Sequence, residues 1–216
     1  MKHVVIVSHP NEDSFTLSVA HAYRDAAERL GGEVLVRDLY RMNFDPRLAK
    51  AEVPHPEGFA PGDDVVAERK LIEDANVFAF VYPLWFNAPP AMTVGYIDRV
   101  FGLGFGFGSS VGGNVPLLTG AKLISFSSSG APKHWLVDTG GWKAVQTLFD
   151  EHLAAVCGFR ALEHVHFGGI TPWLREDIVR DCLDQVGDKV TELISGPQVP
   201  AGPDRDQSTV TLVPRW

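Results

Sequence analysis

The 216-residue chain has few cysteines, few basic residues and no long hydrophobic run. Its two cysteines, Cys157 and Cys182, lie in stretches of helical periodicity, which favours small buried side chains over a disulfide framework. Lys and Arg number 19 against 27 Asp and Glu, a net charge of -8, and no basic cluster stands out. Nucleic acids and anionic membranes are therefore disfavoured as partners. The N-terminal apolar run, Val4 to Val7, is too short for a signal sequence or a membrane span, so we expect a cytoplasmic protein with no integral membrane segment.

Glycine-rich nucleotide motifs and metal-ligand clusters are also missing. Residues 102–108 alternate glycine with large apolar groups, but the third glycine of a G-x-G-x-x-G motif falls on Phe107, and the segment follows a helical pattern. The Gly-Lys-Ser/Thr triplet of a P-loop does not occur. His164 and His166 share one face of a strand candidate, yet no third and fourth ligand is evident at a workable spacing. We therefore predict neither a nucleotide triphosphate site of the P-loop kind nor a metal site.

Strand and helix patterns alternate along the chain five times. Continuous apolar or β-branched runs predict strands at residues 4–7, 33–39, 76–82, 121–127 and 161–167. Apolar spacings of three and four predict helices at residues 14–30, 65–74, 89–101, 141–156 and 174–194. This succession predicts an α/β fold with a doubly wound sheet and helices on both faces. We expect one domain over residues 1–196, followed by an extended tail over residues 197–216.

The most apolar strand candidate ends in a corner that contains two aromatic residues. Pro83 and Leu84 close the strand, and Trp85 and Phe86 follow in the loop before a helix that opens at a double proline. A strand that ends in such a corner presents its last groups at the carboxyl edge of the sheet, where open α/β sheets bind ligands. Aromatic residues in a loop either close a core or face a flat ligand, and the flanking sequence favours the flat ligand.

The loop after the first strand predicts an anion site. His9, Ser14 and Thr16 surround the N-terminus of the first predicted helix, where free N–H groups and the helix dipole favour a phosphate. Ser14 by itself is equally well explained as a plain N-cap. Without a glycine-rich loop, a monophosphate ester held by hydroxyls and amides is the better match.

Four motifs occur in the order found in a known family. They are Ser8-His9-Pro10 with Ser14-Phe15, Asp38-Leu39-Tyr40-x-Met42-Asn43-Phe44-Asp45-Pro46, Pro83-Leu84-Trp85-Phe86-x-x-Pro89, and Gly95-Tyr96-Ile97-Asp98-Arg99-Val100-Phe101. With these motifs the chain resembles, over about residues 1–170, the flavodoxin-like NAD(P)H:quinone oxidoreductases of the DT-diaphorase and bacterial quinone-reductase and drug-modulator types. The resemblance implies a flavodoxin-like five-stranded parallel sheet, a tightly bound flavin and a homodimer with sites at the interface. It also implies two-electron reduction of quinones or similar flat acceptors by NADH or NADPH, through ping-pong hydride transfer.

The resemblance also assigns flavin-binding residues. They are His9, Ser14, Phe15 and Thr16 for the phosphate and ribityl chain, Pro83, Leu84, Trp85 and Phe86 along the isoalloxazine ring, and Ser128, Ser129 and Gly130 where the family has Thr-Thr-Gly-Gly. Whether the flavin is FMN or FAD stays open. The stretch over residues 40–64, where an adenine could rest, is shorter than in the FAD-binding relatives, which favours FMN.

The chain departs from the family at the catalytic positions. The DT-diaphorase type has a tyrosine and a histidine after the glycines, and Trp135 and Gly141 stand at those positions here. Neither can donate or accept a proton as required, and His134 is the imidazole nearby. The candidate catalytic residues are His134 and Trp135, the latter because it stands at the tyrosine position. His134 is equally well explained as a solvated loop histidine. The alternative function is a non-catalytic flavoprotein, either an electron carrier or a regulatory subunit of a membrane transporter.

The glycine-spaced phenylalanines Phe105 and Phe107 bear on the expected homodimer. Glycine costs conformational entropy, and alternate large groups of such a segment would be exposed. We expect both rings to contribute across a two-fold interface, the alternative being that the segment folds back over its own subunit.

Overall fold

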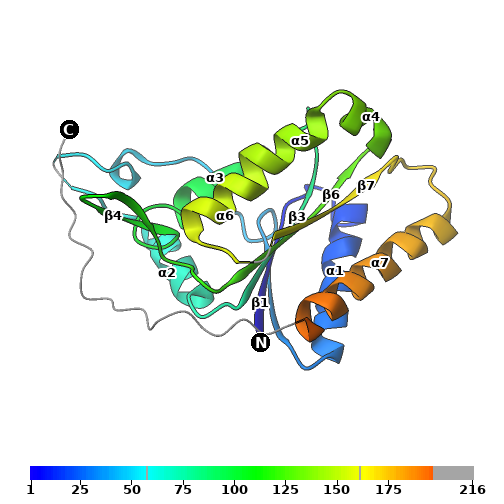
Figure 1. Cartoon of the computed structure of the whole chain (residues 1–216), viewed down its shortest axis with the longest axis horizontal. Coiled ribbons are helices and arrows are strands. Elements are labelled where there is room, and N and C mark those ends of the chain that lie inside the picture. The colour runs from blue at the N-terminus through cyan, green and yellow to red at the C-terminus, as the bar shows by residue number, and fades with distance from the viewer. Residues whose placement is uncertain (57, 161, 197–216) are drawn as a thin grey trace.

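A five-stranded parallel sheet forms the centre of the fold (Figure 1). The computed structural model describes residues 1–56, 58–160 and 162–196, so the expected tail over residues 197–216 lies outside the described residues. The strand order is β2-β1-β3-β6-β7, and every neighbouring pair is parallel. This is the predicted doubly wound, flavodoxin-like sheet. Its strands are β1 Lys2–Val7, β2 Glu33–Asp38, β3 Val77–Pro83, β6 Lys122–Ser129 and β7 Leu162–Gly168.

Helices cover both faces of the sheet (Figure 1). On one face α1 (Phe15–Arg29) and α7 (Glu176–Ser195) lie side by side. The other face is covered by α2 (Asp63–Ile72), α3 (Ala91–Val100) and a continuous helical segment over residues 141–157. That segment consists of α5 (Gly141–Val145), a π-helical turn η2 (Gln146–Glu151) and α6 (His152–Cys157).

The alternation of side chains along β3 creates the two hydrophobic layers. All seven residues of β3 are buried. Val77, Ala79 and Val81 pack with α1 and α7, while Phe78, Phe80 and Tyr82 pack on the opposite face. Successive side chains of a strand point to opposite faces, so a continuous apolar run suits a strand covered on both sides.

Three short elements were not predicted by the sequence patterns. A two-stranded hairpin joins β4 (Phe107–Ser110) to β5 (Gly113–Pro116), and α4 (Lys133–Asp138) follows β6. A 3-10 turn, η1 (Lys50–Glu52), lies in the stretch where prolines obscured any period. All three are too short to show a period in the sequence.

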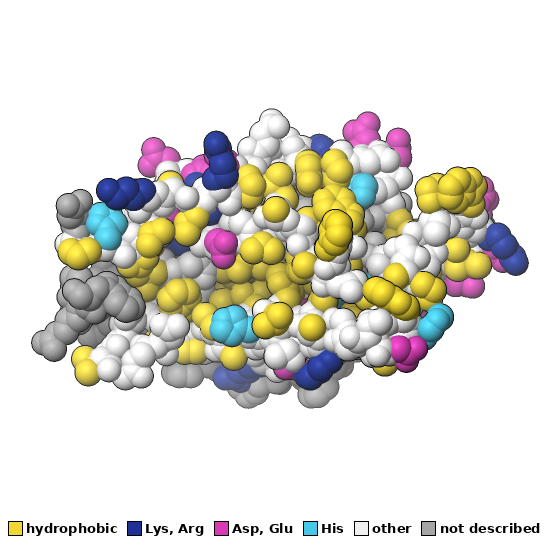
Figure 2. Space-filling model, turned by 90° about the horizontal axis from the view of Figure 1, so that it is seen from above, with side chains coloured by type: hydrophobic (Ala, Val, Ile, Leu, Met, Phe, Trp, Pro, Cys, Tyr) yellow, Lys and Arg dark blue, Asp and Glu magenta, His cyan; other side chains and the backbone are white. Residues whose placement is uncertain are grey.

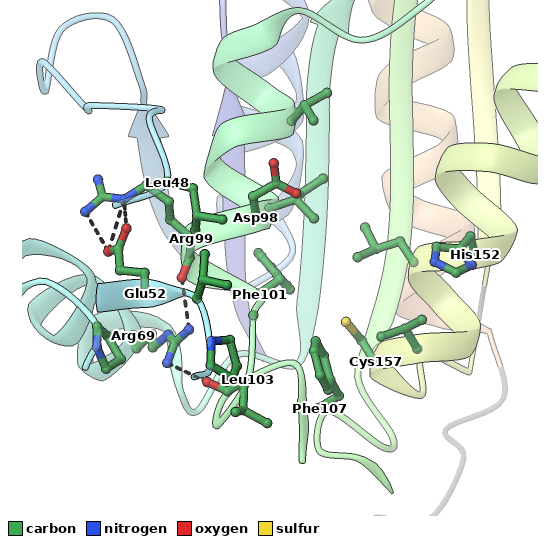
Figure 3. A pocket seen from close by; sticks show the side chains of 18 of the residues that line it. Leu48, Glu52, Arg69, Asp98, Arg99, Phe101, Leu103, Phe107, His152 and Cys157 are labelled. Atoms are coloured by element: carbon green, nitrogen blue, oxygen red, sulfur yellow. Dashed lines mark hydrogen bonds and ion pairs between the residues drawn. The ribbon is translucent and has the colours of Figure 1, made fainter. Parts of the chain in front are cut away.

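Phe105 does not offer its ring to a partner subunit, which corrects one expectation. Its ring is 8% exposed and lies 5.7 Å from the ring of Phe101, and the guanidinium of Arg69 lies 5.8 Å from its centroid. Phe107 is half-buried and lines a cavity between α3 and α6 (Figure 3). Phe105 therefore packs within its own subunit, and a contribution of Phe107 to a two-fold interface stays a prediction.

The proline-rich stretch before α2 is held to α3 by Arg99 (Figure 3). The Arg99 guanidinium binds Glu52 at 2.9 Å, Asp64 at 2.8 Å and the carbonyl oxygen of Asp45 at 2.6 Å. The side chains of Arg99 and Glu52 are 6% and 4% exposed. Charged side chains are seldom buried unless they are paired. The buried ion pair between Arg99 and Glu52 therefore holds this stretch, which has little regular secondary structure, against α3.

Candidate functional site at the carboxyl edge of the sheet

The loop between β1 and α1 is tied to α3 and ends in a helix cap. Ser8 Oγ lies 2.5 Å from Thr93 Oγ1, and Ser14 Oγ accepts the N–H of Leu17 at 3.3 Å. Ser14 is therefore an N-cap, as one reading of the sequence expected. Its side chain is mostly buried, as is that of Thr16. The remaining first-turn amides of a helix have no partner inside the helix, so the start of α1 suits an anion.

The loop after β3 is a tight turn that exposes two aromatic rings. Trp85 and Ala88 exchange backbone hydrogen bonds of 3.0 and 3.1 Å. Between them Phe86 and Asn87 have positive φ values of 52° and 58°. Phe86 is fully exposed and Trp85 is 43% exposed. Left-handed backbone at non-glycine residues costs on the order of 1 to 3 kcal/mol and is concentrated at functional sites.

The three predicted loops meet at this edge. The ring of Trp85 lies 6.0 Å from that of His9, which joins the first two loops. Leu84 is buried, and its N–H donates to the carbonyl oxygen of Ser128 at 2.7 Å. Leu84 therefore continues the pairing of β3 with β6. In the loop after β6, a Cβ atom on Gly130 would meet one carbonyl oxygen among the described residues, that of Ile170 at 3.8 Å. The space next to Gly130 is therefore open to a ligand.

A buried polar stripe runs below this edge, and Ser129 is its one member that the sequence predicted as a site residue. Ser127 Oγ lies 2.7 Å from His164 Nε2 and 2.8 Å from His166 Nδ1. His164 Nδ1 lies 2.6 Å from the Asp150 carboxylate, and His166 Nε2 lies 3.0 Å from Ser129 Oγ. The sequence pattern that could have predicted this stripe is the alternation Ser-x-Ser-x-Ser on β6 together with His-x-His on β7. Within the described ranges, no three acidic, histidine or cysteine side chains are placed to bind a metal.

Comparison with known proteins assigns the chain to a family. Residues 1–190 match the family described as Flavodoxin-like fold. An uncharacterized NAD(P)H oxidoreductase of Haemophilus influenzae is 30% identical over 193 residues, which cover 89% of this chain and 95% of the relative. The chain belongs to the flavodoxin-like oxidoreductase family. The resemblance inferred from its motifs is thus confirmed.

Two further matches widen the comparison for this oxidoreductase. NAD(P)H dehydrogenase [quinone] 1 of Cavia porcellus is 27% identical over 180 residues, which cover 74% of this chain and 66% of that protein. An FMN-dependent NADH-azoreductase of Bacillus anthracis, solved in complex with FMN, superposes with a TM-score of 0.67 at 18% identity. That match covers 89% of this chain and 98% of the azoreductase, and it shows the common fold.

The two candidate catalytic residues of the oxidoreductase lie on α4 and are exposed. His134 is exposed to solvent, and Trp135 is 48% exposed. The structure instead places His166, which is 5% exposed, within hydrogen-bonding distance of the predicted site residue Ser129. Burial, followed by the nearby charges of His164 and Lys133, lowers the pKa of His166 to about 4. A neutral imidazole therefore borders the site from below.

The residues at this edge fit a flavin. A flat ring needs aromatic walls, which Trp85 and Phe86 offer, and a phosphate needs amides such as those at the start of α1. Phe15 contributes a half-buried ring at that helix start, edge-on to Phe167 at 5.5 Å. The open space beside Gly130 allows a close approach of the ring.

Proposed function

We propose that the protein is a flavin-dependent NAD(P)H:quinone oxidoreductase of the cytoplasm. It reduces quinones or similar flat acceptors by two electrons, with donor and acceptor binding in turn. The observation that carries this proposal is the strained turn that exposes Phe86 and Trp85 next to His9 of the loop before α1. The names of the relatives, an NAD(P)H oxidoreductase and a quinone dehydrogenase, support the donor and the acceptor.

The chain supplies orientation, and the bound flavin supplies the redox chemistry. When bound, a flavin accepts a hydride from a nicotinamide and passes two electrons to an acceptor. Trp85 and Phe86 would hold the ring, the first turn of α1 with His9, Ser14 and Thr16 would hold the phosphate, and Ser128 to Gly130 would border the ring edge. Donor and acceptor would use the same ring-sized site in turn. The short stretch before α2 supports FMN over FAD.

Cofactor release and steady-state turnover test this proposal. Heat-released cofactor from the purified protein should be a flavin, and NADH or NADPH oxidation should depend on both flavin and an added quinone. Affinity should be at least about tenfold higher for FMN than for riboflavin, because charge-assisted bonds contribute about 1.5 to 3 kcal/mol. Equal affinity for the two would contradict the phosphate site. Failure to bind any flavin would refute the function.

Trp85→Ala tests the ring site directly. Removal of the indole should raise the dissociation constant for flavin about 5- to 150-fold, because burial and stacking of a ring contribute about 1 to 3 kcal/mol. Trp173→Ala is the control, since Trp173 is 88% exposed and belongs to the loop after β7. Full flavin occupancy and unchanged turnover in Trp85→Ala would show that Trp85 does not line the site.

A non-catalytic flavoprotein is the second candidate, and one observation favours it. The positions that carry a tyrosine and a histidine in the DT-diaphorase type are occupied by Trp135 and Gly141. Bound flavin with negligible NAD(P)H turnover across a panel of quinones would support this candidate and contradict the enzyme.

We further infer a homodimer, on the evidence of the apolar cavity between α3 and α6. Its volume is about 450 Å³, and Figure 3 shows Phe101, Phe107 and Cys157 around it. Leu148 on its rim is 77% exposed, and Figure 2 shows hydrophobic side chains gathered around a hollow on one face of the molecule. Exposed apolar area of this kind is typical of an interface. Leu148→Glu should yield monomers in light scattering, and a wild-type monomer would refute the dimer.

A further inference from the structure

Five side chains form an unbroken hydrogen-bonded chain below the carboxyl edge of the sheet. We call them the serine-histidine chain: Asp150, His164, Ser127, His166 and Ser129. The serines alternate along β6, the histidines alternate along β7, and Ser127 is the register partner of His166. The members of the serine-histidine chain lie among buried residues of the sheet and of the helical segment over residues 141–157. Buried polar groups are costly, so an unbroken chain of them needs an explanation.

One proton arrangement satisfies the chain with both imidazoles neutral. His164 Nδ1–H donates to the Asp150 carboxylate, so its Nε2 accepts from Ser127. Ser127 Oγ then accepts from His166 Nδ1–H, and His166 Nε2 accepts from Ser129. Each hydroxyl has one proton and each neutral imidazole has one N–H, so no other direction is available. The carboxylate gives this arrangement a net charge of −1.

A second arrangement on the same distances contains one more proton. Ser129 now donates to the carbonyl oxygen of Ala131, which lies 2.9 Å away, and accepts from His166 Nε2–H. Ser127 donates to His166 Nδ1 and accepts from His164 Nε2–H. His164 then has protons on both nitrogens beside the carboxylate. The chain is neutral overall, and it uses the Ala131 bond that the first arrangement leaves unmade.

We propose that the serine-histidine chain is a proton store: it takes up one proton at Ser129 and holds it on the His164–Asp150 pair. One proton enters at Ser129, and three protons shift along the chain. They move from Ser129 to His166, from His166 to Ser127 and from Ser127 to His164. No bond other than these O–H and N–H bonds forms or breaks, and release runs the same shifts in reverse.

Burial and charge favour storage at the far end of the chain. The side chains of His164 and Asp150 are each 1% exposed, so a proton there replaces a buried net charge of −1 by a pair that is neutral overall. Ser125 Oγ donates to the second carboxylate oxygen at 2.9 Å, which completes the pair. The lowered pKa of His166 fits a group that passes protons on without keeping a charge.

The other groups that face the two imidazoles are few. Tyr82 of β3 lies edge-on to His164 at 6.0 Å, and burial raises the pKa of its phenol well above the usual value. Trp142 of α5 covers both rings, at 4.7 Å from His164 and 5.4 Å from His166. Lys133 Nζ of α4 lies over the ring of Trp142, 5.3 Å from its centroid. Neither the phenol nor the indole takes up a proton at neutral pH, which leaves the pair with Asp150 as the store.

The store matters for the proposed function, on which this part of the inference rests. Reduction of a quinone by NAD(P)H consumes one hydride and one proton. Ser129 is half-buried at the end of β6, next to the open space at Gly130. A proton held on the chain can leave at this point for a bound acceptor, and solvent restores it afterwards. The chain would thereby compensate for the tyrosine and histidine that the DT-diaphorase type has after its glycines.

The apo-protein tests the proton store without any cofactor. Nitrogen-15 labelling of the histidines shows by NMR which ring nitrogen has a proton. As the pH is lowered, His164 should become doubly protonated while His166 stays neutral and moves its proton from Nδ1 to Nε2. Both changes should share one midpoint, because the chain shifts as a unit. A His166 that keeps its tautomer, separate midpoints, or a fixed protonation state over the folded pH range would each overturn the proposal.

Two serine variants isolate the link between the histidines. Ser127→Ala removes the bridging hydroxyl, so the His166 tautomer should no longer change with His164. Ser125→Ala removes a hydroxyl from the same strand and face but leaves the chain continuous, so the coupled change should persist. If Ser127→Ala does not fold, the coupled change in the unmutated protein decides the question. Coupling that survives in a folded Ser127→Ala would refute the chain.

The flavin-loaded protein separates this inference from the proposed function. Ser129→Ala, measured at full flavin occupancy because Ser129 also borders the proposed flavin site, should lower quinone turnover and shift its pH profile. A protein that binds no flavin but shows the coupled histidine change would refute the function and leave the store intact. Normal turnover and an unchanged pH profile in Ser129→Ala would show that the store does not serve the reaction.

Discussion

Replacement of Arg99 by methionine should destabilise the protein by about 3 to 5 kcal/mol at neutral pH, because it leaves a buried carboxylate without its partner. Glu52 as a whole residue is 7% exposed, and among the described residues its other hydrogen-bond donors are the N–H groups of Ala49 and Gly62, at 2.8 and 3.2 Å. Asp64, the other partner of Arg99, is half exposed and stays solvated after the substitution. The cost therefore arises mainly from Glu52.

The pH dependence of this loss gives the magnitude a second check. The hydrogen bond from Arg99, together with the two backbone amides, lowers the pKa of Glu52 from 4.5 to about 2. That difference corresponds to about 3 kcal/mol. Because the folded-state pKa is the lower one, the stabilisation is complete above pH 4.5 and is lost as the pH falls towards 2. The difference in unfolding free energy between Arg99→Met and the wild type should therefore become smaller as the pH falls from 4.5 towards 2.

Urea unfolding followed by circular dichroism from pH 7 down to about pH 3 measures both effects. Arg47→Ala is the matched control, because Arg47 pairs with Asp45 in the same stretch but is exposed, and its loss should leave stability unchanged. Arg99→Met with Glu52→Met should recover most of the loss, since no charge is then left buried. A loss no larger than that of Arg47→Ala, or one independent of pH, would refute the reasoning.

Three further substitutions or probes test the local geometry. Gly95→Ala should destabilise the protein by about 1 to 3 kcal/mol, because a Cβ atom at residue 95 would lie 2.2 Å from the carbonyl oxygen of Pro46. Gly187→Ala is the control: open space surrounds its Cβ position in α7, so thermal unfolding should show the protein stabilised by up to about 1 kcal/mol. Phe86→Gly should keep or raise the unfolding free energy, because it relieves a positive φ, while flavin titration shows weaker binding; a loss of both would mark Phe86 as structural. Burial raises the pKa of the Cys157 thiol to about 12, so mass spectrometry after iodoacetamide treatment should find Cys182 labelled first.

The fold could be predicted from the sequence because its signals are local and repeated. Runs such as that of β3 identify a strand covered on both faces, and the strand-helix alternation restricts the topology to a doubly wound sheet. Strand ends differ from the expected ones by at most two residues. The helix over residues 141–157 was also expected, although a π-helical turn inside it was not. The family, too, could be recognised from short contiguous motifs.

The site was predictable only where its residues are adjacent in the chain. The start of α1 and the Trp85–Phe86 corner are single loops at strand ends, so the parallel sheet necessarily brings them to one edge. His166 was missed as a neighbour of Ser129 because the two residues are 37 positions apart, and only the pairing of β6 with β7 joins them. His134 was predicted because it is close in sequence to Ser128, Ser129 and Gly130. It is exposed on α4, a helix too short to show a hydrophobic period.

Burial and cross-strand pairing are thus what the tertiary structure alone decided. Hydrophobic periodicity reports which face of an element is covered, and it determined the layers, the strands and the loops at the carboxyl edge. It does not report register, which depends on the packing of whole strands. The serine-histidine chain and the Arg99–Glu52 pair both depend on contacts between residues that are far apart in sequence. Their charges are tolerable in the interior only because the folded chain places each group opposite its partner.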